Sequence, residues 1–266
     1  MIKYVTIGQY LPGDSILHRA DPRVKIILVI LYMVIIFLVN TYMGFGILTL
    51  FTLLAVVSSD IPIVYTLRGL RSILFIVLFA AAINIFTIKG TPVFEYRFIH
   101  ITYEGIDTAV KLALRISLMI VGASLLTLTT TPISLTDGIE KLMEPLKRVG
   151  VPVHEIAMMM TIALRFIPTL LEETDKIMKA QASRGADFDT GNLIQRAKSF
   201  IPVLVPLFIS AFRRADELAM AMEARCYRGS AGRTRMKQLK LTKADAEITI
   251  VMVIFTAGLL YLQYFL

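Results

Sequence analysis

The chain has 266 residues, of which 56% are hydrophobic, and it carries a formal net charge of +8. A soluble globular domain is only about 45–50% apolar, and here the apolar residues come in long uncharged runs, which excludes an ordinary soluble domain. Lysines and arginines kept on the cytoplasmic side of a membrane protein account for the positive charge, so it does not indicate a nucleic-acid partner. The single cysteine, Cys226, excludes an internal disulfide and is typical of a reducing or indifferent compartment.

Residues 1–21 are predicted to form a cytosolic N-terminal arm, because they are polar and lack the pattern of a signal peptide. Asp21 is a suitable N-cap, and Pro22 is a suitable first residue of a helix. A first membrane-spanning helix is therefore expected to begin at Pro22. Its charged residues Arg23 and Lys25 are expected to reach back to the membrane interface.

Residues 22–135 are predicted to contain four transmembrane helices. No charged residue occurs between Lys25 and Asp60. This run is far too long for one span and slightly short for two, since a span needs about 20 residues or as few as roughly 17; two spans are predicted, with the first starting at Pro22. A tight turn near Asn40 is expected to join them.

The next two spans are expected over residues 72–88 and 116–135, where the chain is again uncharged. Arg68 and Arg71 are assigned to a cytoplasmic loop before the third span. Residues 89–111 have alternating aromatic side chains and turn-forming residues, which favours a short hairpin on the outer face.

The last transmembrane helix is expected over residues 248–266, which carry no charge. Of the 28 lysines and arginines, this layout assigns four to the outer side: Lys89, Arg97, Lys111 and Arg115. The excess of positive charge on the other side places the N-terminus in the cytoplasm. With five spans, the C-terminus is expected outside.

Residues 136–247 are predicted to form a cytoplasmic domain of long amphipathic helices, because the segment is too apolar for a plain soluble domain and too charged to span a membrane. One helix is expected over residues 152–184, with a kink at Pro168. A second is expected over residues 199–225, with Pro202 near its first turn and a bend at Pro206. Small side chains such as those of Ala215 and Ala219 permit close packing, so the two helices are expected to form an antiparallel, crossing pair.

The two long helices end in similar sequences, Ser183-Arg184-Gly185 and Ala224-Arg225-Cys226. Gly185 is suited to the left-handed position that follows a helix. A basic residue is favourable at any helix C-terminus, so neither arginine alone indicates a binding site. The repetition, with small residues beside each guanidinium group, favours two docking points for a partner.

Other kinds of site find no support in the sequence. The three histidines His18, His100 and His154 lack ligand spacing, and no metal or catalytic residue is predicted. There is no P-loop motif for binding ATP. The predicted spans hold no charged residue near their centres, which argues against a proton-coupled carrier.

Several motifs together resemble the transmembrane T component of energy-coupling factor (ECF) transporters, and the resemblance covers essentially the whole chain. The opening segment contains Gln9-Tyr10-Leu11-Pro12-Gly13-Asp14-Ser15 and Leu17-His18-Arg19-Ala20-Asp21-Pro22-Arg23. The long helices contain Ala163-Leu164-Arg165-Phe166-Ile167-Pro168 and Arg214-Ala215-Asp216-Glu217-Leu218-Ala219. The paired Ala-Arg-Gly motifs of that family fall at Ser183-Arg184-Gly185 and Ala224-Arg225-Cys226.

The resemblance implies an all-α integral membrane protein in a bacterial or archaeal cell membrane, with no catalytic activity and no cofactor of its own. Two cytosolic ABC-type ATPases, alike or different, would bind ATP and hold the motif arginines in their grooves. One or more integral-membrane S components would bind a vitamin or another micronutrient and topple when the ATPases move. The alternative is a standalone membrane carrier or a membrane-embedded enzyme, which would be active without ATPases.

The chain departs from the family motif at two positions. Ser183 replaces Ala in the first motif, and Cys226 replaces Gly in the second. Both replacements are small, so docking is expected to survive. A left-handed cap is less favourable at Cys226 than at glycine, so the second helix is expected to end differently from the first.

Overall fold

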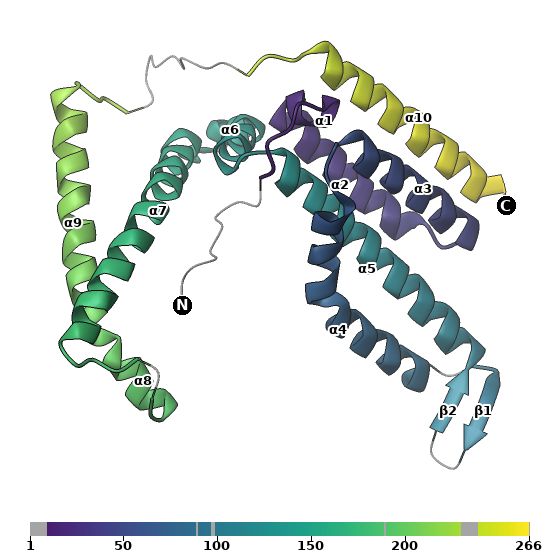
Figure 1. The fold of residues 1–266 in the computed structure, drawn as a ribbon. Coiled ribbons are helices and arrows are strands. Elements are labelled where there is room, and N and C mark those ends of the chain that lie inside the picture. Colours follow the sequence, from purple (N-terminus) through teal and green to yellow (C-terminus); the bar gives the residue numbers. More distant parts are fainter. Residues whose placement is uncertain (1–9, 89, 97–98, 189, 230–238, 266) are drawn as a thin grey trace. The chain divides into compact units, whose positions relative to one another are not determined.

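A computed structural model describes most of the chain, and almost all of it is helical (Figure 1). The described residues are 10–88, 90–96, 99–188, 190–229 and 239–265. Residues 1–9 of the predicted arm, Lys89 and Arg97 lie outside them. The chain divides into two compact units, which we name the bundle unit (8–141 and 238–266) and the long-helix unit (142–237). The prediction of an all-α membrane protein is confirmed.

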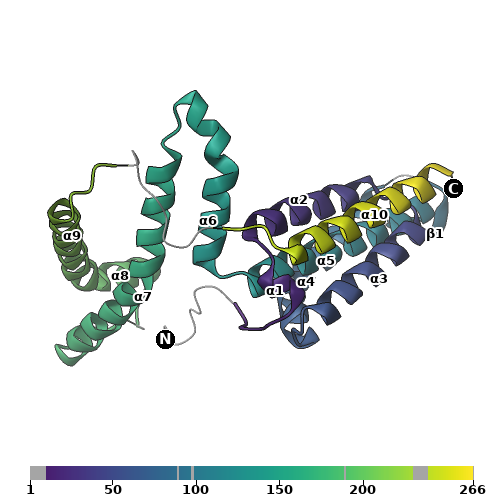
Figure 2. The same ribbon diagram turned by 90° about the horizontal axis from the view of Figure 1, so that it is seen from above.

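The bundle unit consists mainly of helices that run alongside one another. They are α1 (Ile16–Arg19), α2 (Pro22–Leu38), α3 (Tyr42–Ser58), α4 (Ile63–Thr87), α5 (Tyr103–Thr129), α6 (Pro132–Met143, which enters the second unit) and α10 (Lys243–Phe265). Figure 2 shows α2, α5 and α10 side by side. Tyr32 packs in their core with Phe45 and Leu118, and its hydroxyl lies 2.6 Å from the Thr52 hydroxyl.

Side-chain caps begin the first two long helices where the sequence predicts. The Asp21 carboxylate accepts a hydrogen bond from the Arg23 amide, and Pro22 occupies the first turn of α2. Thr41 caps α3 through the Gly44 amide. The tight turn near Asn40 is therefore confirmed.

The predicted bounds of the later helices are wrong, because an uncharged window marks only the middle of a helix. Arg68 and Arg71 lie inside α4 rather than in a loop. α4 itself bends by 52° between its parts Ile63–Arg71 and Ile73–Thr87. α5 begins at Tyr103, where Thr102 provides its cap. Likewise, α10 begins at Lys243, ahead of the start predicted at residue 248.

The predicted hairpin is present between α4 and α5. Strands β1 (Pro92–Tyr96) and β2 (Ile99–Thr102) pair antiparallel, with Glu95 opposite His100. An irregularity in register lies between Pro92 and Phe94. The hairpin joins two long helices without extending either of them.

The helices of the bundle alternate in direction, and hydrogen bonds at their ends show this. α2 and α10 run parallel, because the Asp21 amide donates to Asp245 at one end while Gln263 Nε2 donates to the Leu38 carbonyl at the other. α5 runs the opposite way, with Asp107 beside Tyr42 and Thr129 beside Lys25. We call these the Asp21 end and the hairpin end of the bundle.

Lys25 is buried, and its side chain reaches back past the start of its own helix, where Nζ donates to the His18 carbonyl at 3.4 Å. The position of Lys25 at a membrane interface stays a prediction. Its Nζ donates to the Thr129 carbonyl at 3.0 Å and to the Thr130 hydroxyl at 3.1 Å. The last carbonyls of a helix lack partners within it, and this lysine supplies one to α5. Arg23 turns instead to Asp21, with which it forms an ion pair of 2.7 Å.

The long-helix unit contains η1 (Glu144–Val149), α7 (Val153–Ser183), α8 (Leu193–Ser199) and α9 (Ile201–Ala224). α6 ends at Met143, and the chain continues directly as the 3₁₀ helix η1. α7 and α9 run through Pro168 and Pro206 without interruption. Pro202 lies in the first turn of α9.

Length and composition alone do not separate bundle helices from the long helices. Among the described residues, α5, α7, α10 and the stretch Ile194–Ala224 are long and apolar enough to cross a membrane, and α4 makes a fifth if its bent halves count together. The assignment of residues 136–247 to the cytoplasm thus stays a prediction.

Candidate functional site

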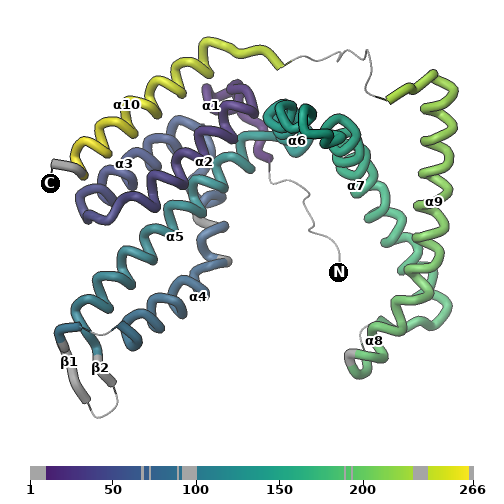
Figure 3. Tube along the Cα trace, turned by 180° about the vertical axis from the view of Figure 1, so that it is seen from behind, coloured from purple at the N-terminus to yellow at the C-terminus, as the bar shows by residue number. Residues whose placement is uncertain are grey.

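The candidate site is the pair of helices α7 and α9, which run antiparallel and meet near α8 (Figure 3). The Gln181 side chain near the end of α7 donates a hydrogen bond of 3.2 Å to the Pro202 carbonyl at the start of α9. The C-terminus of α7 therefore lies beside the N-terminus of α9.

A polar contact joins the middles of the two helices. Glu173 of α7 accepts hydrogen bonds from the Ser210 hydroxyl at 2.5 Å and from Arg214 at 2.7 Å. Nothing in the sequence pattern pointed to this contact, because the partners lie on separate helices about forty positions apart. Half-exposed ion pairs contribute only about 0–1 kcal/mol, so the contact orients the pair more than it stabilises it.

Beyond this contact an apolar groove of about 560 Å³ opens between the two helices. α7 contributes Ile162, Phe166 and Leu170, and α9 contributes Ala211, Ala215, Leu218, Ala219 and Met222, with Arg214, Glu223 and Tyr227 also lining the groove. Ala215 and Ala219, predicted to pack at a helix crossing, line this groove and remain exposed.

The first predicted motif ends α7 with a paired hydrogen-bond cap. Arg184 is the C-cap, and Gly185 adopts the left-handed conformation with φ of 90°. The Ala186 amide donates to the Gln181 carbonyl and the Gly185 amide donates to the Ala182 carbonyl, both at 3.0 Å. This is the Schellman arrangement, in which two otherwise unpartnered carbonyls are satisfied.

The second motif ends α9 in the same way, so the expectation that it ends differently is wrong. Arg225 is the C-cap, and Cys226 has φ of 56°. The Tyr227 amide donates to Met222 at 3.0 Å and the Cys226 amide donates to Glu223 at 2.8 Å. A left-handed conformation costs a non-glycine residue about 1–2 kcal/mol, and the two cap hydrogen bonds offset this cost.

Tyr227 is a residue of this site that the sequence analysis missed. It occupies the position after the left-handed residue, where an apolar side chain commonly packs back on the helix. Tyr227 and Met222 both line the groove. The signal available in the sequence was an aromatic residue two positions after Arg225.

The two arginines are exposed and are not brought together. Because the end of α7 lies beside Pro202, Arg225 is separated from the first motif by nearly the whole of α9. At 1.5 Å per residue this is about 35 Å along the helix. The helix pair therefore presents the Arg184 guanidinium group near the start of α9 and the equivalent group of Arg225 at the other end of α9.

Neither a metal site nor a catalytic cluster is found in this region. Over the part of the chain that the structure describes, no three His, Cys, Asp or Glu side chains gather as metal ligands.

Comparison with known proteins places these features in a family. A family model described as "Cobalt transport protein" (CbiQ) matches residues 13–237, a range that contains both motifs and the groove. The chain belongs to the CbiQ family. The family model covers the opening segment from Gly13, the bundle up to α6 and both long helices.

Curated relatives match over nearly the full chain. A protein of Ruminiclostridium cellulolyticum named energy-coupling factor transporter transmembrane protein EcfT is 67% identical over 264 residues, covering 99% of each chain. Proteins of the same name from Clostridium kluyveri and Bacillus subtilis are 58% and 46% identical, over 92% and 99% of this chain and 92% and 100% of theirs. The predicted family resemblance is confirmed, and with the long apolar helices it makes this CbiQ-family chain a multi-pass membrane protein.

Proposed function

We propose that the chain is the non-catalytic coupling subunit of an ECF-type ABC importer. The single observation that carries this proposal is the repetition of one cap geometry at Arg184 and Arg225. A left-handed cap ends roughly a third to a half of all helices, so what distinguishes these two ends is the same exposed arginine at the C-cap of both long helices. Two exposed ends with the same backbone geometry and the same arginine suit two copies of the same kind of binding groove.

Two cytosolic ABC ATPases are the proposed partners at these ends. The separation of about 35 Å along α9 keeps the arginines too far apart for one groove, so each would dock in its own ATPase subunit. ATP would be bound and hydrolysed in those partners, and this chain needs no cofactor. The left-handed residues Gly185 and Cys226 turn the chain away directly after each arginine, which leaves both guanidinium groups accessible.

An integral-membrane S component is the proposed partner of the apolar faces of the pair. Phe208 and Phe212 of α9 are 61% and 69% exposed, and the groove beside them is lined mainly by apolar side chains. A cytosolic domain that leaves such side chains in water is expected to be covered by another apolar surface. The substrate, a vitamin or another micronutrient, would be bound by the S component.

The membrane topology proposed for this function has the N-terminus in the cytoplasm and the C-terminus outside. The alternation of helix directions in the bundle supports it, because the Asp21 end holds the start of α2 and the start of α10. Both chain segments that lead to the long-helix unit leave from that same end. A cytoplasmic position of the Asp21 end therefore gives a cytoplasmic long-helix unit.

Purification of the tagged chain from its native membrane in mild detergent, followed by mass spectrometry, tests the proposal. We expect two P-loop ATPases and one or more small hydrophobic proteins to accompany it. Arg184→Glu and Arg225→Glu are each expected to lose ATPase binding, by about 2–5 kcal/mol, the usual cost of disrupting a buried charge contact at an interface.

Arg213→Glu is the matched control, since it reverses an exposed charge in the middle of α9. It is expected to retain the ATPases. Recovery of the chain alone, under conditions that preserve other membrane complexes, contradicts the proposal and favours the standalone carrier or enzyme.

A further inference from the structure

Two chain connections link the bundle unit to the long-helix unit, one after Lys141 and one before Gln238. The proposed coupling function requires the long helices to move, and these two connections are the covalent paths from them to the bundle. Where each connection is fixed to the bundle therefore decides which bundle helix receives the movement. Both are fixed to the same five residues, Asp21 to Lys25.

The first connection is held by close packing and by Lys25. A Cβ atom placed on Gly138 of α6 would lie 3.0 Å from Pro22 Cβ and 3.2 Å from a methyl carbon of Ile26. This leaves no space for a larger residue, so α6 rests directly on the first turn of α2. Just before α6, the buried Lys25 ammonium holds the Thr129 carbonyl and the Thr130 hydroxyl.

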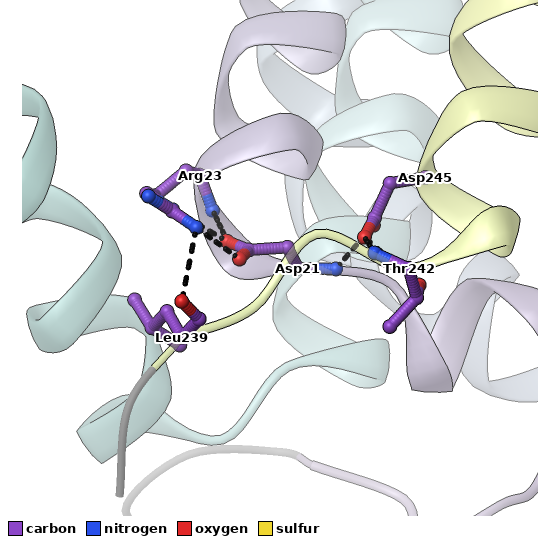
Figure 4. A network of polar contacts seen from close by, with 5 residues as sticks. All are labelled: Asp21, Arg23, Leu239, Thr242 and Asp245. Atoms are coloured by element: carbon purple, nitrogen blue, oxygen red, sulfur yellow. Dashed lines mark hydrogen bonds and ion pairs between the residues drawn. The ribbon is translucent and has the colours of Figure 1, made fainter.

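The second connection is held by a carboxylate network at the start of α10, drawn in Figure 4. Asp245 is 2% exposed and accepts from the Asp21 amide at 2.5 Å and from the Thr242 amide at 2.6 Å. Arg23 donates to the Leu239 carbonyl at 3.5 Å, close to the point where the chain enters the bundle. The same Arg23 side chain grips both oxygens of Asp21.

Two features distinguish this cluster from ordinary helix capping. Asp21 and Asp245 are both almost fully buried, and they share their surroundings with the cations of Arg23 and Lys25. Breaking a buried, hydrogen-bonded charge network is costly, so the cluster is stiff. Its members also come from segments 224 positions apart, namely the start of α2 and the start of α10.

We propose that the Asp21–Lys25 segment is a mechanical anchor, through which movement of the long-helix unit is passed to α2 and from there to the bundle. The anchor rests on the proposed coupling function. Asp21, Arg23, Lys25, Gly138 and Asp245 act as positioning residues, and none of them contacts a substrate or nucleotide. The cluster stays closed while the long helices move.

Hydrogen–deuterium exchange of the complete detergent-purified complex tests the anchor, with and without ATP plus orthovanadate. In the wild-type complex we expect nucleotide to change exchange in α7 and α9 and also in α2 and α10. In Asp245→Asn the change in α7 and α9 is expected to persist. The change in α2 and α10 is expected to fall at least about fivefold, the lower end of the usual coupling between sites.

Gly138→Val tests the first connection independently and is expected to have the same effect as Asp245→Asn. Two controls match these variants. Asp107→Asn removes a carboxylate at the hairpin end, where it accepts from the Tyr42 hydroxyl and the Lys111 ammonium group. Gly258→Val adds the same side chain where no atom lies within 4 Å. Both controls are expected to respond to nucleotide like the wild type.

The outcomes separate failure of the anchor from failure of the coupling function. If no ATPases copurify with the wild type, or if nucleotide leaves α7 and α9 unchanged, the coupling function itself is wrong. If α7 and α9 respond and both anchor variants pass the change to α2 and α10 as the wild type does, the anchor alone is wrong. A wild-type bundle that does not respond to nucleotide also overturns the anchor.

Discussion

The bundle unit and the long-helix unit differ in how far each buries its own apolar side chains. In the bundle, apolar side chains such as Phe45 and Ile36 are almost fully buried, and hydrogen bonds between polar groups join the helix ends. In the long-helix unit, Phe208 and Phe212 stand exposed on α9. The bundle also exposes large apolar side chains, such as Phe75 at 79%, but it encloses a buried core. Among the described apolar residues of the long-helix unit, the buried ones are Val153, Ala157 and Val203.

The largest expected difference in stability is between truncation of a buried aromatic residue in the bundle unit and of an exposed one in the long-helix unit. Phe45→Ala is expected to lower the free energy of unfolding by about 3–5 kcal/mol, because Phe45 is 1% exposed and its removal leaves a cavity. Phe212→Ala, at 69% exposure, is expected to change it by less than about 0.5 kcal/mol. Denaturant titration of the purified chain measures both. Equal losses would contradict the comparison.

A smaller effect is expected from adding one methyl group to the bundle. A Cβ on Gly122 of α5 would lie 2.5 Å from the Tyr32 ring, so Gly122→Ala is expected to cost about 1–3 kcal/mol through overpacking. Gly46→Ala is the control, because no atom lies within 4 Å of its added Cβ. Thermal unfolding of the two variants distinguishes them, and a stable Gly122→Ala chain would show that α2 and α5 can separate.

The two arginine motifs provide a mirrored pair of substitutions. Cys226→Gly is expected to stabilise the end of α9 by about 1 kcal/mol, since it relieves a left-handed non-glycine residue. Gly185→Ala is expected to destabilise the end of α7 by a similar amount, because Gly185 has φ of 90°. Amide exchange at Ala186 and Tyr227 reports the two caps. Effects of the same sign would mean that the caps differ.

The smallest expected effect concerns the contact between the long helices. Glu173→Gln removes the charge that accepts from Arg214 while it keeps an acceptor for Ser210. Because the pair is partly exposed, the loss of stability is expected to be at most about 1 kcal/mol. Raising the salt concentration should weaken the wild type and leave the variant almost unchanged. A salt response in the variant equal to that of the wild type would show that the ion pair contributes nothing.

Much of the fold was predictable because its signals are local. The caps at Asp21 and Gly185 each depend on a few neighbouring residues, and both are present. The starts of α5 and α10 were predicted too late, because charged residues lie within their first turns and a hydropathy window stops at them. Cys226 was misjudged for a related reason: intrinsic preference favours glycine there, but the hydrogen bonds of the cap outweigh it.

The amino-acid sequence by itself determined the helical membrane class, the turn at Asn40 and the repeated arginine motif, since each follows from residues close together in the chain. Only the tertiary structure decided which partners the charged residues at the Asp21 end contact. Lys25 is buried there because its ammonium group donates to the carbonyl of Thr129, the last residue of α5. Asp245 meets Asp21 across 224 positions, and a hydrogen bond over that separation exists only after the helices have packed.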